Sequence, residues 1–153
     1  MQWCEVIADP TLRDLPYKIE INKWGIIEMS PASNWHAMTQ GDLVALLRGF
    51  FQFGRVFVEC SIQTTDGVRV PDVAWCSDEF LTAHGEETPF SSAPELCIEV
   101  VSPYNSRPEM ERKIGLLLEA DAQEVWLVSR EGFEFYGSEG RLERSGFGVE
   151  PHL

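Results

Sequence analysis

The chain has 153 residues, of which 44% are hydrophobic and 24% are charged, so we expect residues 1–153 to form one domain with a substantial core. Lys and Arg number 12 against 25 Asp and Glu, and the resulting net charge of −13 argues against strong nonspecific binding to nucleic-acid phosphates. No apolar run approaches the roughly 18 residues of a membrane helix. The opening residues MQWCEVIADP also lack the regions of a signal peptide, so the expected compartment is the cytoplasm.

Four cysteines are spread along the chain without a C-x-x-C pair or a histidine at zinc-ligand spacing. They are Cys4, Cys60, Cys76 and Cys97. We interpret them as reduced, mostly buried small hydrophobic residues, which is consistent with a reducing compartment.

The first predicted elements are a hairpin and a helix. Residues 17–31 alternate apolar and polar side chains around a four-residue connection at 22–25, which favours a β-hairpin. Residues 33–51 place leucines and phenylalanines at helical spacing, with Ser33 or Asn34 as the N-cap. The same helical face extends back to Gln40 and His36, which we interpret as the capped, partly exposed start of a core helix.

The rest of the chain predicts strands and one further helix. Strand-like runs occur at residues 55–63, 68–76, 94–101, 123–129, 133–137 and 141–145. A tight turn at 64–67 joins the first two, and a second helix is expected over 109–120. This order predicts an α/β (α+β) fold, in which a mixed sheet is flanked by two helices and preceded by an N-terminal hairpin.

Two of the predicted strands contain a carboxylate. Asp72 follows Pro71 in one strand, and Glu99 interrupts an apolar run in another. Either acid alone is explained as well by a strand edge or an exposed end. Two buried acids in neighbouring strands would each cost several kcal/mol, or would take up a proton. A divalent cation that bridges them removes that cost, and Mg²⁺ suits oxygen ligands.

Lys113 lies within the apolar stripe of the second predicted helix, between Met110 and Leu117. A lysine in that position indicates an ammonium that reaches toward negative charge. Two alternatives stay open: an ion pair with Glu109, or a stem that carries the ammonium out to water.

Several of these segments together resemble a known family. The runs IIEMSP, VRVPDVAW, PELCIEVVSP and EMERKIGLLLEADAQEVWLV, with His36 after the first, are similar to the Uma-type endonucleases of the PD-(D/E)XK nuclease superfamily. The resemblance extends over about residues 17–137 and implies a restriction-endonuclease-like fold. It also implies a bacterial, Mg²⁺-dependent nuclease, with Mn²⁺ as an alternative ion, that hydrolyses phosphodiester bonds in nucleic acid, DNA more than RNA.

The resemblance also implies roles for individual residues. Asp72 and Glu99 match the metal-binding acids, and the backbone carbonyl of Val100 is a further expected ligand. The usual lysine of the superfamily would fall at position 101, which is Val101 here. Lys113 corresponds to a lysine that this family carries in the following helix, where it would orient the attacking water or stabilise charge in the transition state.

Further residues are expected near the same cleft. Gln63 and Glu59 come from the preceding strand, and Arg112 belongs to a positive rim that would also include Arg69, Arg107 and Lys113. Resemblance to nucleases that cut duplexes in pairs favours a homodimer, and the five tryptophans and nine phenylalanines would either cover its interface or fill the core.

Two rival functions remain at this stage. One is a degenerate member of the fold that binds a partner or oligomerises without catalysis. In that case, we expect Lys113 to point away from the acids or to pair with Glu109. The other is hydrolysis of a small phosphate ester, which would need a closed pocket.

Overall fold

The computed structural model describes residues 1–152. In chain order its elements are α1 (Trp3–Ala8), the 3-10 turn η1 (Pro10–Leu12), β1 (Tyr17–Ile21), β2 (Ile27–Pro31), α2 (Asn34–Phe50), β3 (Arg55–Val58), β4 (Ile62–Thr64), β5 (Gly67–Arg69), β6 (Val73–Cys76), α3 (Asp78–His84), β7 (Leu96–Val100), α4 (Arg107–Glu119), β8 (Glu124–Ser129), β9 (Gly132–Gly137) and β10 (Gly140–Leu142). Within these residues, no helix is both long and apolar enough to cross a membrane.

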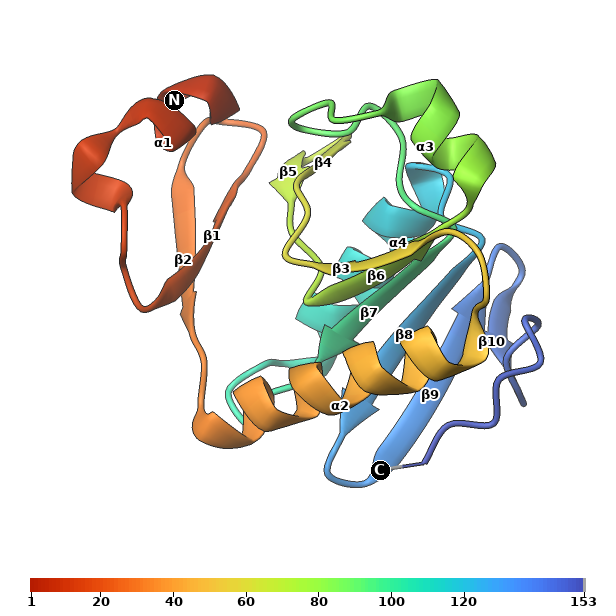
Figure 1. The fold of residues 1–153 in the computed structure, drawn as a ribbon. Coiled ribbons are helices and arrows are strands. Elements are labelled where there is room, and N and C mark those ends of the chain that lie inside the picture. Colours follow the sequence, from red (N-terminus) through yellow and green to blue (C-terminus); the bar gives the residue numbers. More distant parts are fainter. Residues whose placement is uncertain (153) are drawn as a thin grey trace.

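The larger sheet has six strands in the order β10-β9-β8-β7-β6-β3, and only the β7–β8 pair is parallel. Helices α2 and α4 cover its two faces (Figure 1). Because side chains alternate along a strand, Ile98 of β7 faces α2 and Cys97 faces α4. By the same alternation Glu99 faces α4, the helix that carries Lys113. The predicted mixed sheet with a helix on each side is confirmed.

The smaller sheet has four strands in the order β2-β1-β5-β4. It contains the predicted N-terminal hairpin, whose strands pair from Tyr17 opposite Pro31 to Ile21 opposite Ile27. Helix α1 packs on this sheet, where Val6 joins Ile21 in a small apolar cluster. The hairpin and α1 lie to one side of the large sheet (Figure 1).

The strands predicted at 55–63 and 68–76 are each broken in two, and their halves belong to different sheets. Glu59, after β3, has a φ of 54°, a left-handed conformation that a strand does not accommodate. Between β5 and β6, Pro71 lacks the N–H that a ladder needs. β4 and β5 therefore extend the hairpin sheet, while β3 and β6 pair in the large sheet. The segment in which Asp72 lies is the crossing between the two sheets.

Three helices differ from the sequence-based expectation, and of these α1 and α3 were not predicted at all. The segment 77–93, between two of the predicted strands, contains α3, whose start is capped by the Ser77 side chain, which accepts the N–H of Phe80. Helix α4 begins at Arg107, earlier than predicted, because Ser106 and Glu109 form a capping box at its start.

Candidate functional site

A cavity of about 410 Å³ lies where the two sheets meet. Its charged and histidine lining residues come from both sheets and from α2 and α4: Lys18, Glu20, His36, Glu59, Asp72, Glu99, Glu109 and Lys113. Five acids and two lysines therefore share one small space, and they come from elements that are distant in the sequence.

Asp72 is fully buried and is held from several sides. Its backbone N–H donates to the carbonyl of Ile98 at 3.0 Å, and its Oδ2 accepts the N–H of Val100 at 2.7 Å. His36 Nε2 lies 3.2 Å from the same Oδ2. The other oxygen, Oδ1, accepts a hydrogen bond from Lys18 Nζ at 2.8 Å. These contacts fix the orientation of the Asp72 carboxylate beside the C-terminal end of β7.

Glu99 lies between two lysines and is only 2% exposed. Its Oε2 accepts a hydrogen bond from Lys18 Nζ at 3.2 Å. Lys113 Nζ lies 2.8 Å from Oε1, the distance of an ion pair, and a carboxylate oxygen offers two lone pairs. Glu99 Oε1 therefore retains acceptor capacity inside the cavity.

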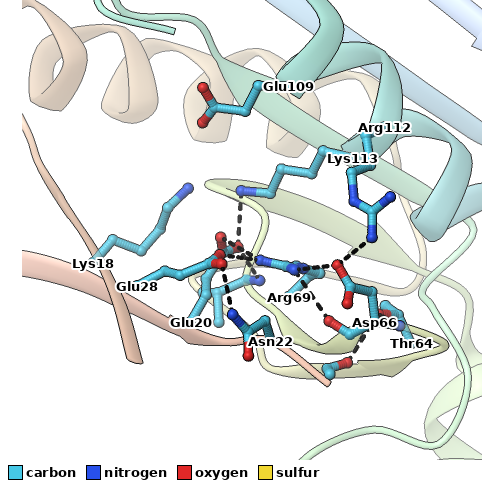
Figure 2. Close-up of polar contacts among 12 residues, drawn as sticks. Lys18, Glu20, Asn22, Glu28, Thr64, Asp66, Arg69, Glu109, Arg112 and Lys113 are labelled. Carbon is cyan, nitrogen blue, oxygen red and sulfur yellow. Dashed lines mark hydrogen bonds and ion pairs between the residues drawn. The ribbon is translucent and has the colours of Figure 1, made fainter. Parts of the chain in front are cut away.

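Lys113 is directed into the site and not toward Glu109. Its Nζ lies 2.8 Å from Glu20 Oε1, the oxygen that also accepts the Val70 N–H at 2.6 Å. Figure 2 shows the lysine extended from α4 toward Glu20, with Glu109 directed elsewhere. Glu109 instead accepts hydrogen bonds from the Asn105 side chain and the Ser106 N–H at the start of α4. Both alternatives left open for Lys113 are therefore excluded, since its ammonium is buried with Glu20 and Glu99.

Three carboxylates share two ammonium groups, so one carboxylate is less well compensated. Burial raises the pKa of Glu99 to about 7, against the attraction of Lys113 and Lys18. Burial acts in the same direction on Asp72, but the charge of Lys18 and the hydrogen bond from His36 outweigh it and hold the pKa of Asp72 well below its ordinary value. The pKa of Glu20 is also lowered, because Lys113 and Lys18 outweigh its burial. The proton that this cluster keeps most readily is the one on Glu99.

The structure brings together most, but not all, of the residues singled out in the sequence. Asp72, Glu99, Val100, Lys113 and Glu59 line the cavity. Two residues expected in the cleft do not line it. Gln63 lines a separate hollow, and its amide donates to the carbonyls of Thr64 and Gly67. Arg112 pairs with Asp66 at 2.7 Å.

The expected positive rim is absent from the described residues, because its arginines are neutralised by acids. Arg69 is buried against Glu28 and Asp66, as Figure 2 shows, and Arg112 shares Asp66. Arg107 pairs with Glu134 at 2.8 Å. Part of the excess of acidic residues therefore neutralises these arginines one by one.

Three residues of the site were missed or interpreted differently. Lys18 and Glu20 stand two apart in β1, so they share one face of that strand. The sequence signal that could have revealed these two residues was the pair of opposite charges on one face of a strand. His36 does stand at the capped start of α2, with its N–H bonded to Ser33 Oγ. Its side chain, however, reaches Asp72.

The donor set fits a hard divalent cation, with one condition. No group of three His, Cys, Asp or Glu side chains among residues 1–152 is spaced to hold a metal. Asp72 and Glu99 nevertheless converge on one cation, Lys18 Nζ, and Glu99 Oε1 retains a lone pair beside Lys113. Val100, whose N–H binds Asp72, also lines the cavity, and its backbone carbonyl would be the further oxygen ligand. Mg²⁺ commonly binds one or two carboxylates and keeps several waters. The condition is that the Lys18 ammonium leaves its position between Asp72 and Glu99.

Comparison with solved structures shows which fold the chain has. The chain is similar to the crystal structure of a putative nuclease belonging to DUF820 from Anabaena variabilis ATCC 29413, with a TM-score of 0.71 and 19% sequence identity. The similarity covers 100% of this chain and 94% of that one, so the mixed α+β fold is the one found in that protein. A family model described as "Uma2: Putative restriction endonuclease" matches residues 10–147, and the chain belongs to this family. No curated protein matches it.

Proposed function

We propose that this chain is a divalent-metal-dependent endonuclease that hydrolyses phosphodiester bonds of nucleic acid. The observation that carries the proposal is the convergence of Asp72 and Glu99, two buried carboxylates from the crossing segment and β7, with Lys113 of α4. Membership of a family described as restriction endonucleases supports this chemistry and favours DNA over RNA as the substrate.

In this proposal, Asp72, Glu99 and the Val100 carbonyl hold Mg²⁺, or Mn²⁺ in its place. When bound, such an ion supplies Lewis-acid polarisation of the phosphate and a bound water of lowered pKa. Lys113 is the nearest fixed cation to Glu99, 2.8 Å away, and would orient the attacking water or stabilise charge that develops on the phosphate. The Val100 N–H and His36 fix the orientation of the Asp72 carboxylate, which would hold the metal.

The charge distribution supports a metal-dependent rather than a purely electrostatic mode of binding phosphate. The net charge is −13, and Arg69, Arg107 and Arg112 are each paired with acids. Positive charge for the scissile phosphate would therefore come from the bound metal and from the lysines of the cavity.

The test uses a double variant, Asp72→Asn with Glu99→Gln, which removes both negative charges with little change of shape. We expect Mn²⁺ and Mg²⁺ binding, measured by calorimetry, to be lost, together with cleavage of plasmid and oligonucleotide DNA. The exposed Glu143→Gln is the matched control, since it removes a carboxylate outside the cavity. Unchanged metal binding or unchanged cleavage in the double variant would contradict the proposal.

A second candidate is a binding module that keeps the nuclease fold without catalysis. The observation that favours it is Lys18, whose ammonium already contacts both Asp72 and Glu99. If Lys18 were a permanent substitute for the metal, the wild-type chain would bind no divalent cation even with oligonucleotide present. The calorimetric titration distinguishes the two functions directly.

A further inference from the structure

We propose that Lys18 is a built-in counter-cation of the site, which a divalent metal must displace before Asp72 and Glu99 can both bind it. The proposal rests on the proposed function and concerns how metal access to that site is controlled.

The contacts of Lys18 are those that a bridging cation would make. Its Nζ lies 2.8 Å from Asp72 Oδ1 and 3.2 Å from Glu99 Oε2, and it contacts no other carboxylate at ion-pair distance within residues 1–152. Asp72 lies in the crossing segment directly before β6, and Glu99 lies in β7, which pairs with β6, so one cation between the two acids satisfies both. An ammonium directs its protons into the same lone pairs that a metal would use.

Lys18 and a metal cannot occupy this place together. Mg²⁺ binds oxygen at about 2.0–2.1 Å and Ca²⁺ at about 2.3–2.6 Å, so either ion would overlap the position of the ammonium. Like charges at such short range also repel strongly. Metal binding therefore includes the free energy of moving Lys18, and the apparent metal affinity is lowered by that amount.

Lys113 has a different position and need not move. It contacts Glu99 Oε1 and Glu20 Oε1 and makes no contact with Asp72 at ion-pair distance in the described chain. It stands on the flank of the acid pair, whereas Lys18 stands between its members. Removal of either lysine takes one positive charge from the same cavity, but only removal of Lys18 clears the bridging position.

The fold offers the Lys18 ammonium a second position outside the acid pair. It sits on β1 with its side chain 12% exposed, on a flexible four-carbon stem. A second hollow is lined by Lys18 together with Glu59, an exposed carboxylate that also lines the main cavity. A displaced ammonium can therefore turn toward Glu59 and water without leaving the protein surface.

The decisive experiment is calorimetric titration of the full chain with Mn²⁺ and with Mg²⁺. Variants that remove each of the three lysines in turn give matched losses of charge: Lys18→Met, Lys113→Met and Lys23→Met. Lys23 is exposed on the hairpin connection, over the Trp24 ring and outside the cavity, so it controls for net charge. We expect Lys18→Met to bind metal at least about tenfold more tightly than wild type, Lys113→Met to gain less, and Lys23→Met to match wild type.

Three results would overturn the proposal, and one of them would also contradict the proposed function on which it rests. Equal affinity in wild type and Lys18→Met would mean that metal binds with Lys18 in place. An equal gain in Lys113→Met and Lys18→Met would mean that only total charge matters. Absence of binding in all variants would contradict the metal site of the proposed function itself, which is a different outcome from equal binding.

A measurement on the unmutated chain covers the case in which Lys18→Met fails to fold. Protein with ¹⁵N-labelled lysine side chains is titrated with Mg²⁺ and followed by NMR. We expect one ammonium signal, assigned through the charge-conserving Lys18→Arg variant, to lose its protection from solvent exchange as metal binds. Metal binding that leaves this signal unchanged would overturn the proposal.

Discussion

The carboxylate of Asp72 accepts the backbone N–H of Val100 at 2.7 Å, and Val100 directly follows Glu99. This single bond fixes the relative position of the two acids, because it ties the crossing segment that carries Asp72 to the end of β7. The two carboxylates are therefore part of the strand pairing itself and not loose groups at a surface.

Replacement of Asp72 should separate its structural role from its charge. Asp72→Asn keeps an oxygen that can accept the Val100 N–H, whereas Asp72→Ala leaves that buried N–H without a partner. We expect Asp72→Ala to be less stable than Asp72→Asn by about 1–3 kcal/mol, measured as the free energy of unfolding in urea. Equal stabilities would show that the bond contributes nothing.

The raised pKa of Glu99 predicts a pH-dependent stability in the absence of metal. The folded chain keeps the Glu99 proton up to about pH 7, while the unfolded chain releases it near the ordinary value of 4.5. The stabilising contribution of that proton is therefore complete below pH 4.5 and is lost as the pH rises through 7.

Glu99→Gln has no proton to lose, so its free energy of unfolding in EDTA should rise relative to wild type by on the order of 3 kcal/mol between pH 4.5 and 8. Urea titrations at several pH values measure this difference. The exposed Glu143→Gln provides the control, and its curve should run parallel to that of wild type. A constant gap between Glu99→Gln and wild type would contradict the predicted shift.

Arg69 joins the two strands of the hairpin to the turn before β5. It is 6% exposed, and its guanidinium contacts Glu28 and Asp66. Arg69→Met leaves these acids without their buried partner and should cost about 3–5 kcal/mol in urea unfolding. Arg141→Met, whose side chain is 60% exposed beside Glu134, should cost less than about 1 kcal/mol. Similar losses in the two variants would argue against a central role for Arg69.

The start of α4 supports the helix that carries Lys113. Ser106 accepts the N–H of Glu109, whose side chain in turn accepts the Ser106 N–H. Ser106→Ala removes this cap and should lower the free energy of unfolding by about 1 kcal/mol. Ser138→Ala, on an exposed turn, should have no measurable effect. No loss in Ser106→Ala would show that the cap is dispensable.

The sequence predicted the layers of the fold because its apolar periodicities are regular. The stripe of α4 and the apolar run of β7 both appear where expected, and Lys113 stands out because it breaks its stripe. The division into two sheets was not predictable in the same way. It depends on the left-handed backbone of Glu59, a residue whose type does not indicate that conformation.

The parts of the site that pattern alone did not reveal are those that depend on distant pairing. Lys18 meets Asp72 across 54 residues and Glu99 across 81. In sequence, Lys18 and Glu20 look like the exposed face of a hairpin strand, since alternation says which residues share a face but not what covers it. His36 reads as a helix start for the same reason, although its ring ends beside Asp72.

These separations also bear on how the protein is made. During synthesis, Lys18 and Asp72 are added to the chain before Glu99, and Lys113 follows later still. Hairpins and helices can form locally during that time, but the charge cluster requires the small sheet to dock on the large one after Lys113 has been added. A chain that ends before α4, or that is incompletely folded, would hold the separate pieces of the charge cluster without its geometry.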